Sequence, residues 1–196
     1  MANISELGQL QTSEPLDFDI YKDAQDLPPL PSAGEYVVRA PETFPQEAFG
    51  KTRANHLSVQ VDPTIIGPTN EGYVIRFTKV SAKPFKRGGV TVSQLGDYLR
   101  AVGWTQKLIT EQEKADAVEL TTNLTYRVMT DWRAYDKNDD GTAFVVEGMT
   151  NFPSDGNGGY SPFVSNPGHK DLITGEPVLV RANLVVRRYV PAAAQV

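Results

Sequence analysis

Residues 71–103 read EGYVIRFTKVSAKPFKRGGVTVSQLGDYLRAVG, and this stretch passes from a strand pattern to a helix pattern. Residues 73–80 are rich in β-branched and aromatic side chains, which predicts a strand. Alternation places three apolar residues on one face of that strand: Tyr73, Ile75 and Phe77. The segment that joins the two patterns, residues 83–89, is basic and ends in two glycines, so we expect a flexible, positively charged loop tip.

Two helices are expected after this strand. Thr91 and Gln94 fit a capping box, in which the Thr91 side chain accepts from the backbone and Gln94 reaches back. Gly103 stands where a glycine commonly ends a helix. Thr110 and Glu113 form a second capping box, which predicts the start of the second helix. The first helix would bury a stripe of apolar residues: Val92, Leu95, Leu99 and Val102.

Several other segments of the chain alternate between apolar and polar residues, as half-buried strands do. Expected strands cover residues 34–40, 57–61, 124–134, 142–149 and 178–187. In the strand over residues 124–134, Trp132 shares the apolar face.

These elements predict one domain over residues 34–190, because a chain of 196 residues is ordinary for a single domain. Residues 1–33 are acidic and end in Pro28-Pro29-Leu30-Pro31, which favours an extended N-terminal arm. Residues 151–176 are rich in Gly, Pro, Asn and Ser, so we expect a long loop there. Residues 191–196 form a short tail. The fold expected is mainly β with two short helices: an OB-like Greek-key β-barrel, since that fold also places a helix after its third strand.

Charge is divided unevenly along the chain. The net charge of -5 and the pI of about 5.1 exclude a uniformly basic protein. Residues 73–107, however, carry a net charge of +6, and residues 177–196 carry +3. If the two segments are neighbours in space, they form one positive face.

The basic stretch interleaves cations with aromatic rings, the combination that single-stranded nucleic acid needs along its phosphates and bases. The expected contacts to nucleic acid are Arg76, Lys79, Lys83, Phe85, Lys86, Arg87, Arg181, Arg187 and Arg188. Candidate stacking residues are Phe85 first, then Tyr73, Phe77 and Trp132. A solvated strand edge, which often carries Lys to prevent aggregation, is the alternative interpretation.

A calcium-loop pattern is also present, since residues 136–147 match D-x-[DN]-x-[DN]-G-x5-E. Its candidate ligands are Asp136, Asn138, Asp140 and Glu147. Both flanks alternate like strands rather than helices, so a hairpin turn is the favoured interpretation, and we expect no bound metal.

Catalytic patterns are weak. The chain has no cysteine, which excludes thiol chemistry and cysteine-ligated metals, and it has only two histidines, His56 and His169. No phosphate-binding glycine loop or nucleophile elbow is present. We therefore expect neither a catalytic activity nor a cofactor.

Residues 71–103 and the stretch LTYRVMTDWRAYDKNDDGTAFVVEGMTNFP, residues 124–153, resemble small phage-encoded OB-fold single-stranded-DNA-binding proteins. The resemblance is carried by element order, with a strand, a helix ending at Leu99-x-x-x-Gly103, and further strands. It implies a non-catalytic binder of single-stranded nucleic acid, with DNA as the implied ligand and RNA left open. Replication or recombination proteins and further copies of the chain are the implied partners. One departure is that the acidic segment lies at the N-terminal side, whereas many replication-type binders end in an acidic tail.

Two other functions stay open. The arm and the long loop suit a viral structural or assembly protein, and the Asp-rich turn suits a calcium-dependent β-domain that binds carbohydrate. Because no targeting segment or long apolar run is visible, we expect no membrane partner and a cytoplasmic location, in the host cytoplasm for a viral protein.

Overall fold

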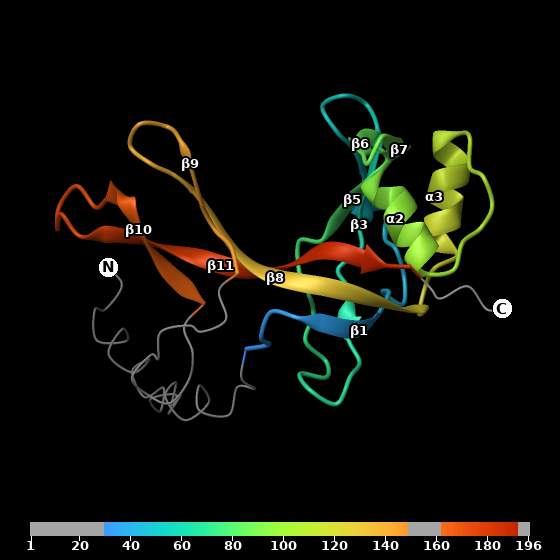
Figure 1. The fold of residues 1–196 in the computed structure, drawn as a ribbon, viewed down its shortest axis with the longest axis horizontal. Helices are drawn as coiled ribbons and strands as arrows, with labels where there is room; N and C mark the ends of the chain where they lie inside the picture. Colours follow the sequence, from blue (N-terminus) through green and yellow to red (C-terminus); the bar gives the residue numbers. More distant parts are fainter. Residues whose placement is uncertain (1–29, 149–161, 192–196) are drawn as a thin grey trace, which may run out of the picture.

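The computed structural model describes residues 30–148 and 162–191 and has two α-helices among many strands (Figure 1). The first half holds β1 (Glu35–Arg39), η2 (Gln46–Ala48), β2 (Phe49–Lys51), β3 (Leu57–Gln60), β4 (Thr64–Ile65), β5 (Lys79–Ser81), β6 (Phe85–Arg87) and β7 (Val90–Val92). The second half holds α2 (Gln94–Ala101), α3 (Glu111–Glu119), β8 (Thr125–Lys137), β9 (Ala143–Val146), β10 (Phe163–Lys170) and β11 (Pro177–Val190).

The long antiparallel pair of β8 and β11 is the centre of the largest sheet. The strands of that sheet follow the order β10-β11-β8-β1-β4, and β9 pairs with the end of β8. A smaller sheet has the order β2-β3-β5, and β6 and β7 form a hairpin. The large sheet curls into a half barrel, which confirms the expectation of a mainly β, barrel-like fold with two helices (Figure 1).

Alternation along β8 fills the core of the half barrel. Tyr126, Val128, Trp132 and Ala134 are all buried, as the sequence pattern predicts. Trp132 also donates from its indole N–H to the carbonyl of Pro31 at 2.8 Å. The proposal that Trp132 stacks on a base is therefore wrong: its ring is a core element, and a buried indole needs such an acceptor.

The first residues that the structure describes, 30–33, pack against this core. Leu30 and Ala33 contact it, and Pro31 supplies the acceptor for Trp132. Residues 1–29, most of the expected arm, lie outside the described residues.

The helix α2 begins two residues later than the predicted capping box places it. Ser93 is the N-cap, and its side chain accepts from the backbone N–H of Gly96 at 3.0 Å. Thr91 instead belongs to β7, where extended backbone continues the hairpin. Gly103 has a φ of +87° and donates to the carbonyl of Arg100, so it ends the helix as predicted.

The helix α3 has the capping box that the sequence predicts, with Thr110 and Glu113 bonding to each other's backbone. Glu111 reaches from its first turn to the backbone N–H of Leu57 at 2.7 Å, which ties the helix to β3. Lys114 pairs with the same carboxylate, and its bond is the largest influence lowering the pKa of Glu111.

The strand predicted over residues 73–80 is interrupted. Only Lys79–Ser81 forms a regular strand, β5, and Val74 makes an isolated bridge with Thr64. The chain turns at Arg76 and Phe77, and Asp62 stabilises the turn by accepting from the backbone N–H of Thr78 at 2.8 Å. Ile75 is buried while Phe77 points to solvent, so the two do not share the predicted face.

The long loop predicted over residues 151–176 contains a strand. β10 pairs antiparallel with β11, with Phe163 opposite Arg181 and Val164 opposite Val180. Part of the expected loop, residues 151–161, lies outside the described residues. The Gly and Pro content of this segment hid the strand, because such residues are more common in loops than in strands.

Candidate nucleic-acid interface

Two adjoining hollows lie along one edge of β11. Within the described residues, the part of β11 from 182 to 190 pairs only with β8, so its other edge is free of strand partners. The hollows measure about 440 and 370 Å³, and Phe77 lines both of them. Seven of the nine residues predicted to contact nucleic acid line one or the other: Arg76, Lys79, Phe85, Arg87, Arg181, Arg187 and Arg188. The two basic segments of the sequence therefore meet along this edge.

Phe77 stands at the junction of the hollows with 69% of its surface exposed. Its φ of +61° is in the left-handed region, which bulky side chains rarely adopt. Hydrogen bonds on both sides over-determine this conformation: Asp62 accepts from the N–H of Thr78, and the Thr78 hydroxyl donates to the carbonyl of Ile75 at 2.8 Å. Strained backbone held in this manner clusters at functional sites.

The first hollow brings two cations to a tyrosine. Arg76 and Arg181, far apart in sequence, both line it together with Tyr73. Burial raises the pKa of the Tyr73 hydroxyl, and the two guanidinium groups oppose that rise, so the phenol is neutral at pH 7. The hollow thus offers an aromatic ring and two positive charges, and the one acidic residue that the described chain places at its rim is Glu71.

The second hollow is lined by Lys79, Arg188 and the β6–β7 hairpin. In the hairpin, the Arg87 guanidinium lies 5.2 Å from the centre of the Phe85 ring and pairs with Asp97 at 2.7 Å. Asp97 also binds Arg100 at 2.5 Å. This carboxylate itself lines the second hollow, where it pairs with Arg87, and it also holds Arg100, which lies outside that hollow.

Ion pairing divides the predicted cations into two groups. Arg187 is the extra residue at a bulge in β11, and it lies 4.0 Å from Asp131 and 3.6 Å from Glu147. Arg87 pairs with Asp97, as above. The remaining four cations that line the hollows have no ion pair within the described part of the chain: Arg76, Lys79, Arg181 and Arg188.

Lys83 and Lys86 do not line either hollow. Lys86 donates to Thr91 across the β6–β7 hairpin at 2.7 Å, and Lys83 lies in the connection before it. The loop tip predicted over residues 83–89 is only partly a loop, because Phe85–Arg87 form β6 and the turn is confined to Gly88 and Gly89, whose φ angles are +56° and +81°. Both positive values suit a two-residue turn between antiparallel strands.

The calcium-ligand candidates are each engaged in hydrogen bonds or ion pairs of the protein. They surround the turn between β8 and β9, where Asp140 accepts from Thr142 and Asp136 accepts from residues of β10. Glu147 instead pairs with Arg133 at 2.5 Å. Across residues 30–148 and 162–191, no group of three or more acidic or histidine side chains is placed to hold a metal ion. The favoured hairpin turn is confirmed.

Several residues that line the hollows were not predicted from sequence patterns. Leu30 lines the first hollow although it belongs to the expected arm, and Asn183 joins it from β11. The apolar Leu30 within a proline-rich, acidic segment was the available signal, since a fully solvated arm has no need of it.

Comparisons with known proteins identify no relative of this chain. No family model matches the chain, and neither the curated proteins nor the solved structures give a match. Among the described residues, no helix is long and apolar enough to span a membrane.

Proposed function

We propose that the protein binds single-stranded nucleic acid along the free edge of β11, without catalysing a reaction. The observation that carries the proposal is Phe77, an exposed ring held outward by a left-handed backbone between two hollows lined by cations. A base stacks on such a ring, and the phosphates on either side meet the cations. The half barrel would then be an OB-like Greek-key arrangement, which binds single strands on an exposed face.

The four cations without an ion pair among the described residues are placed to meet phosphates. Arg76 and Arg181 lie on one side of Phe77, and Lys79 and Arg188 lie on the other. A nucleotide chain presents its charges at regular intervals, so it can satisfy both hollows at once. Each phosphate neutralised contributes a slope of about -0.7 to the dependence of log affinity on log salt for a single strand.

A fluorescence anisotropy titration with labelled oligothymidylate at several salt concentrations tests the proposal. Phe77→Ala should weaken binding about 5- to 150-fold, because stacking of one base is worth about 1–3 kcal/mol. Tyr135→Ala removes an exposed aromatic ring outside the hollows and should leave binding unchanged. Failure of the unmodified protein to bind at low salt would overturn the proposal.

A second pair of variants separates the hollows from overall charge. Arg76→Ala with Arg181→Ala should weaken binding and reduce the magnitude of the salt slope by about 0.7 for each phosphate that is no longer neutralised. Lys51→Ala with Arg53→Ala removes the same charge from exposed positions outside the hollows. Equal reductions of affinity in the two double variants would contradict a site at β11. Repeating the titration with oligouridylate distinguishes DNA from RNA as the ligand.

A further inference from the structure

The turn between β10 and β11 exposes two large apolar side chains. Leu172 and Ile173 are 102% and 95% exposed, more than any other large apolar residue in the described part of the chain. Adjacent apolar residues at the tip of a hairpin forgo favourable burial unless a partner covers them.

Hydrogen bonds hold this tip in one shape. A single carboxylate oxygen of Asp171 accepts from the backbone N–H groups of Ile173 and Thr174 at 2.9 and 2.8 Å. The backbone N–H of Asp171 donates to the carbonyl of Glu176 at 2.8 Å, and Gly175 closes the turn with a φ of +71°. Leu172 and Ile173 are therefore presented together, and binding costs little further conformational entropy.

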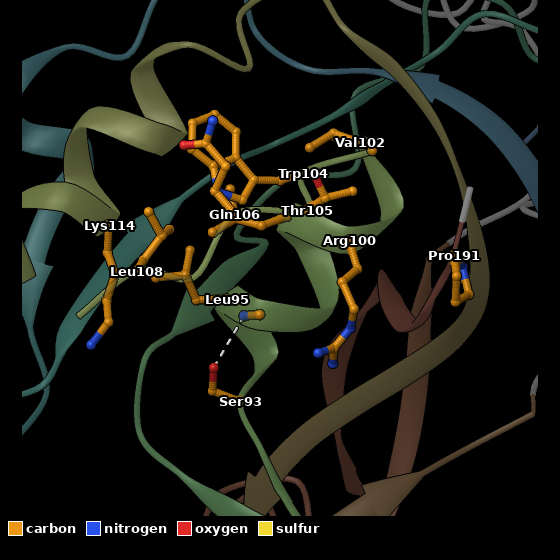
Figure 2. Close-up of a pocket in the computed structure, with 13 residues that line it drawn as sticks. Ser93, Leu95, Arg100, Val102, Trp104, Thr105, Gln106, Leu108, Lys114 and Pro191 are labelled. Carbon is orange, nitrogen blue, oxygen red and sulfur yellow. Dashed lines mark hydrogen bonds between the residues drawn. The ribbon is translucent and has the colours of Figure 1, made fainter. Parts of the chain in front are cut away.

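An apolar hollow of about 980 Å³ lies beside α2 and the segment that follows it (Figure 2). Six apolar side chains line it: Leu95, Leu99, Val102, Trp104, Leu108 and Pro191. The indole N–H of Trp104 is buried and has no hydrogen-bond partner in the described structure. An unsatisfied buried donor costs about 1–3 kcal/mol, so this wall of the hollow is incompletely hydrogen-bonded within the described chain.

The charges of the tip and the hollow are complementary. Among the described residues, the only charged ones that line the hollow are Arg100 and Lys114. Their carboxylate partners, Asp97 and Glu111, do not line it, and exposed pairs of this kind are weak. The tip carries Asp171 and Glu176 and no cation between them, with Lys170 immediately before the turn.

The tip and the hollow lie at opposite ends of the molecule. Figure 1 shows the turn between β10 and β11 near one end of the longest axis and α2 and α3 near the other. The tip of a chain therefore lies far from its own hollow, and a second copy can supply it. A contact of this heterologous type leaves a free tip and a free hollow at the two ends of an open assembly, and it forms a ring where the rotation between copies closes.

We propose that copies of this chain associate head to tail, with Leu172 and Ile173 of one copy seated in the hollow beside α2 of the next. The apolar lining receives the two side chains, and Arg100 and Lys114 face Asp171 and Glu176 of the partner. The proposal does not depend on nucleic acid, so its outcome is independent of the proposed function.

Sedimentation velocity of the full chain without nucleic acid tests it. The weight-average mass should rise with concentration past twice the 21.5 kDa of the monomer. Leu172→Asp with Ile173→Asp should hold the protein at the monomer mass, while Leu120→Asp, an exposed leucine outside the hollow, should not. A monomer at every concentration, or association that the tip variant leaves intact, would overturn the proposal.

Mixing two variants identifies the geometry of the contact. Arg100→Glu with Lys114→Glu keeps the tip but reverses the charge of the hollow, and it should also be monomeric. In an equal mixture, the intact tip of this variant meets the intact hollow of the Leu172→Asp, Ile173→Asp variant. The mixture should form dimers and no larger species, because no second matching pair remains. Mixtures that stay monomeric would contradict a head-to-tail contact. Circular dichroism of each variant excludes unfolding as the cause.

Discussion

The half barrel and the extension beyond it differ in packing, because most of the buried apolar residues lie in the half barrel and Val164 of β10 is one of the few in the extension. In the half barrel, β1, β8, β11 and α2 surround one continuous apolar cluster that includes Trp132 and Tyr98. In the extension, the β8–β9 and β10–β11 hairpins diverge from the barrel (Figure 1), and a polar group joins them. Asn166, fully buried, donates to Asp136 at 3.1 Å, and His169 contacts the same carboxylate at 3.1 Å.

This difference indicates why the extension can carry interaction surfaces. The extension has fewer buried apolar residues than the half barrel, and its polar cluster of Asp136, Asn166 and His169 depends on a few hydrogen-bond distances. The backbone of β10 also approaches the turn of the other hairpin closely: a Cβ at Gly168 would lie 2.4 Å from the side chain of Asn138. The extension should therefore open locally while the half barrel stays folded.

The largest expected effect is in the half barrel. Trp132→Ala should lower the free energy of unfolding by about 3–5 kcal/mol, because it leaves a cavity and removes the bond to Pro31. Met129→Ala on the outer face of the same strand should cost far less. Urea denaturation followed by circular dichroism measures both. Similar decreases in stability for the two variants would show that the half barrel does not depend on this core.

A smaller and more local effect is expected in the extension. Asn166→Ala leaves the N–H of Gly168 without its partner and removes one of the two partners of an Asp136 oxygen, which keeps His169; the unpaired N–H costs about 1–3 kcal/mol. Hydrogen exchange should accelerate in β10 and not in β1 or β3. Ser165→Ala, exposed on the opposite face of β10, is the control. Faster exchange throughout the chain would contradict independent opening of the extension.

Two variants distinguish Ser93 from Thr91 as the residue that caps α2. Ser93→Ala should cost about 1 kcal/mol, since it removes the acceptor for the N–H of Gly96. Thr91→Ala should cost less, because its hydroxyl accepts from the exposed Lys86. Thermal unfolding of the two variants compares them directly. A greater destabilisation by Thr91→Ala would favour the earlier helix start.

The smallest expected effect is an acid dependence of the extension. The bond to His169, followed by those to Asn166 and the N–H of Lys137, lowers the pKa of Asp136 below its ordinary 3.8. A lowered folded-state pKa stabilises the protein above the ordinary value, and this contribution disappears as the pH falls through the lowered pKa. The protection factors of the β10 amides, which compare exchange with the intrinsic rate at the same pH, should therefore fall in acid. Asp136→Asn should abolish that part of the dependence. If the pH dependence of β10 is the same in the variant, other carboxylates cause that dependence.

Local patterns predicted much of the half barrel. The alternation along β8, the capping box of α3 and the glycine that ends α2 all depend on neighbouring residues, and all three are confirmed. The start of α2 was misplaced because Thr91 and Ser93 are both acceptable caps. Only the pairing of β6 with β7 decides between them, since it keeps Thr91 extended.

The candidate site was predicted by residue type but not by arrangement. The alternating residues around Phe77 favour a strand, and no residue type among them predicts the positive φ of Phe77. The turn at Phe77 depends on Asp62, a residue from a different segment. Leu30 reaches the site because Trp132 holds the next residue, Pro31, by a hydrogen bond to its carbonyl. Contacts between residues so far apart in the sequence cannot be predicted from local periodicity.

The sequence by itself determined the mainly β character, the two helices and the division of charge into basic and acidic segments, because composition and periodicity are local properties. Tertiary structure decided that the two basic segments meet at one edge of β11, that Phe77 faces outward while Trp132 is buried, and that Leu172 and Ile173 stand at a tip. Each of these depends on strand pairing and burial between residues distant in sequence, which only the folded chain brings together.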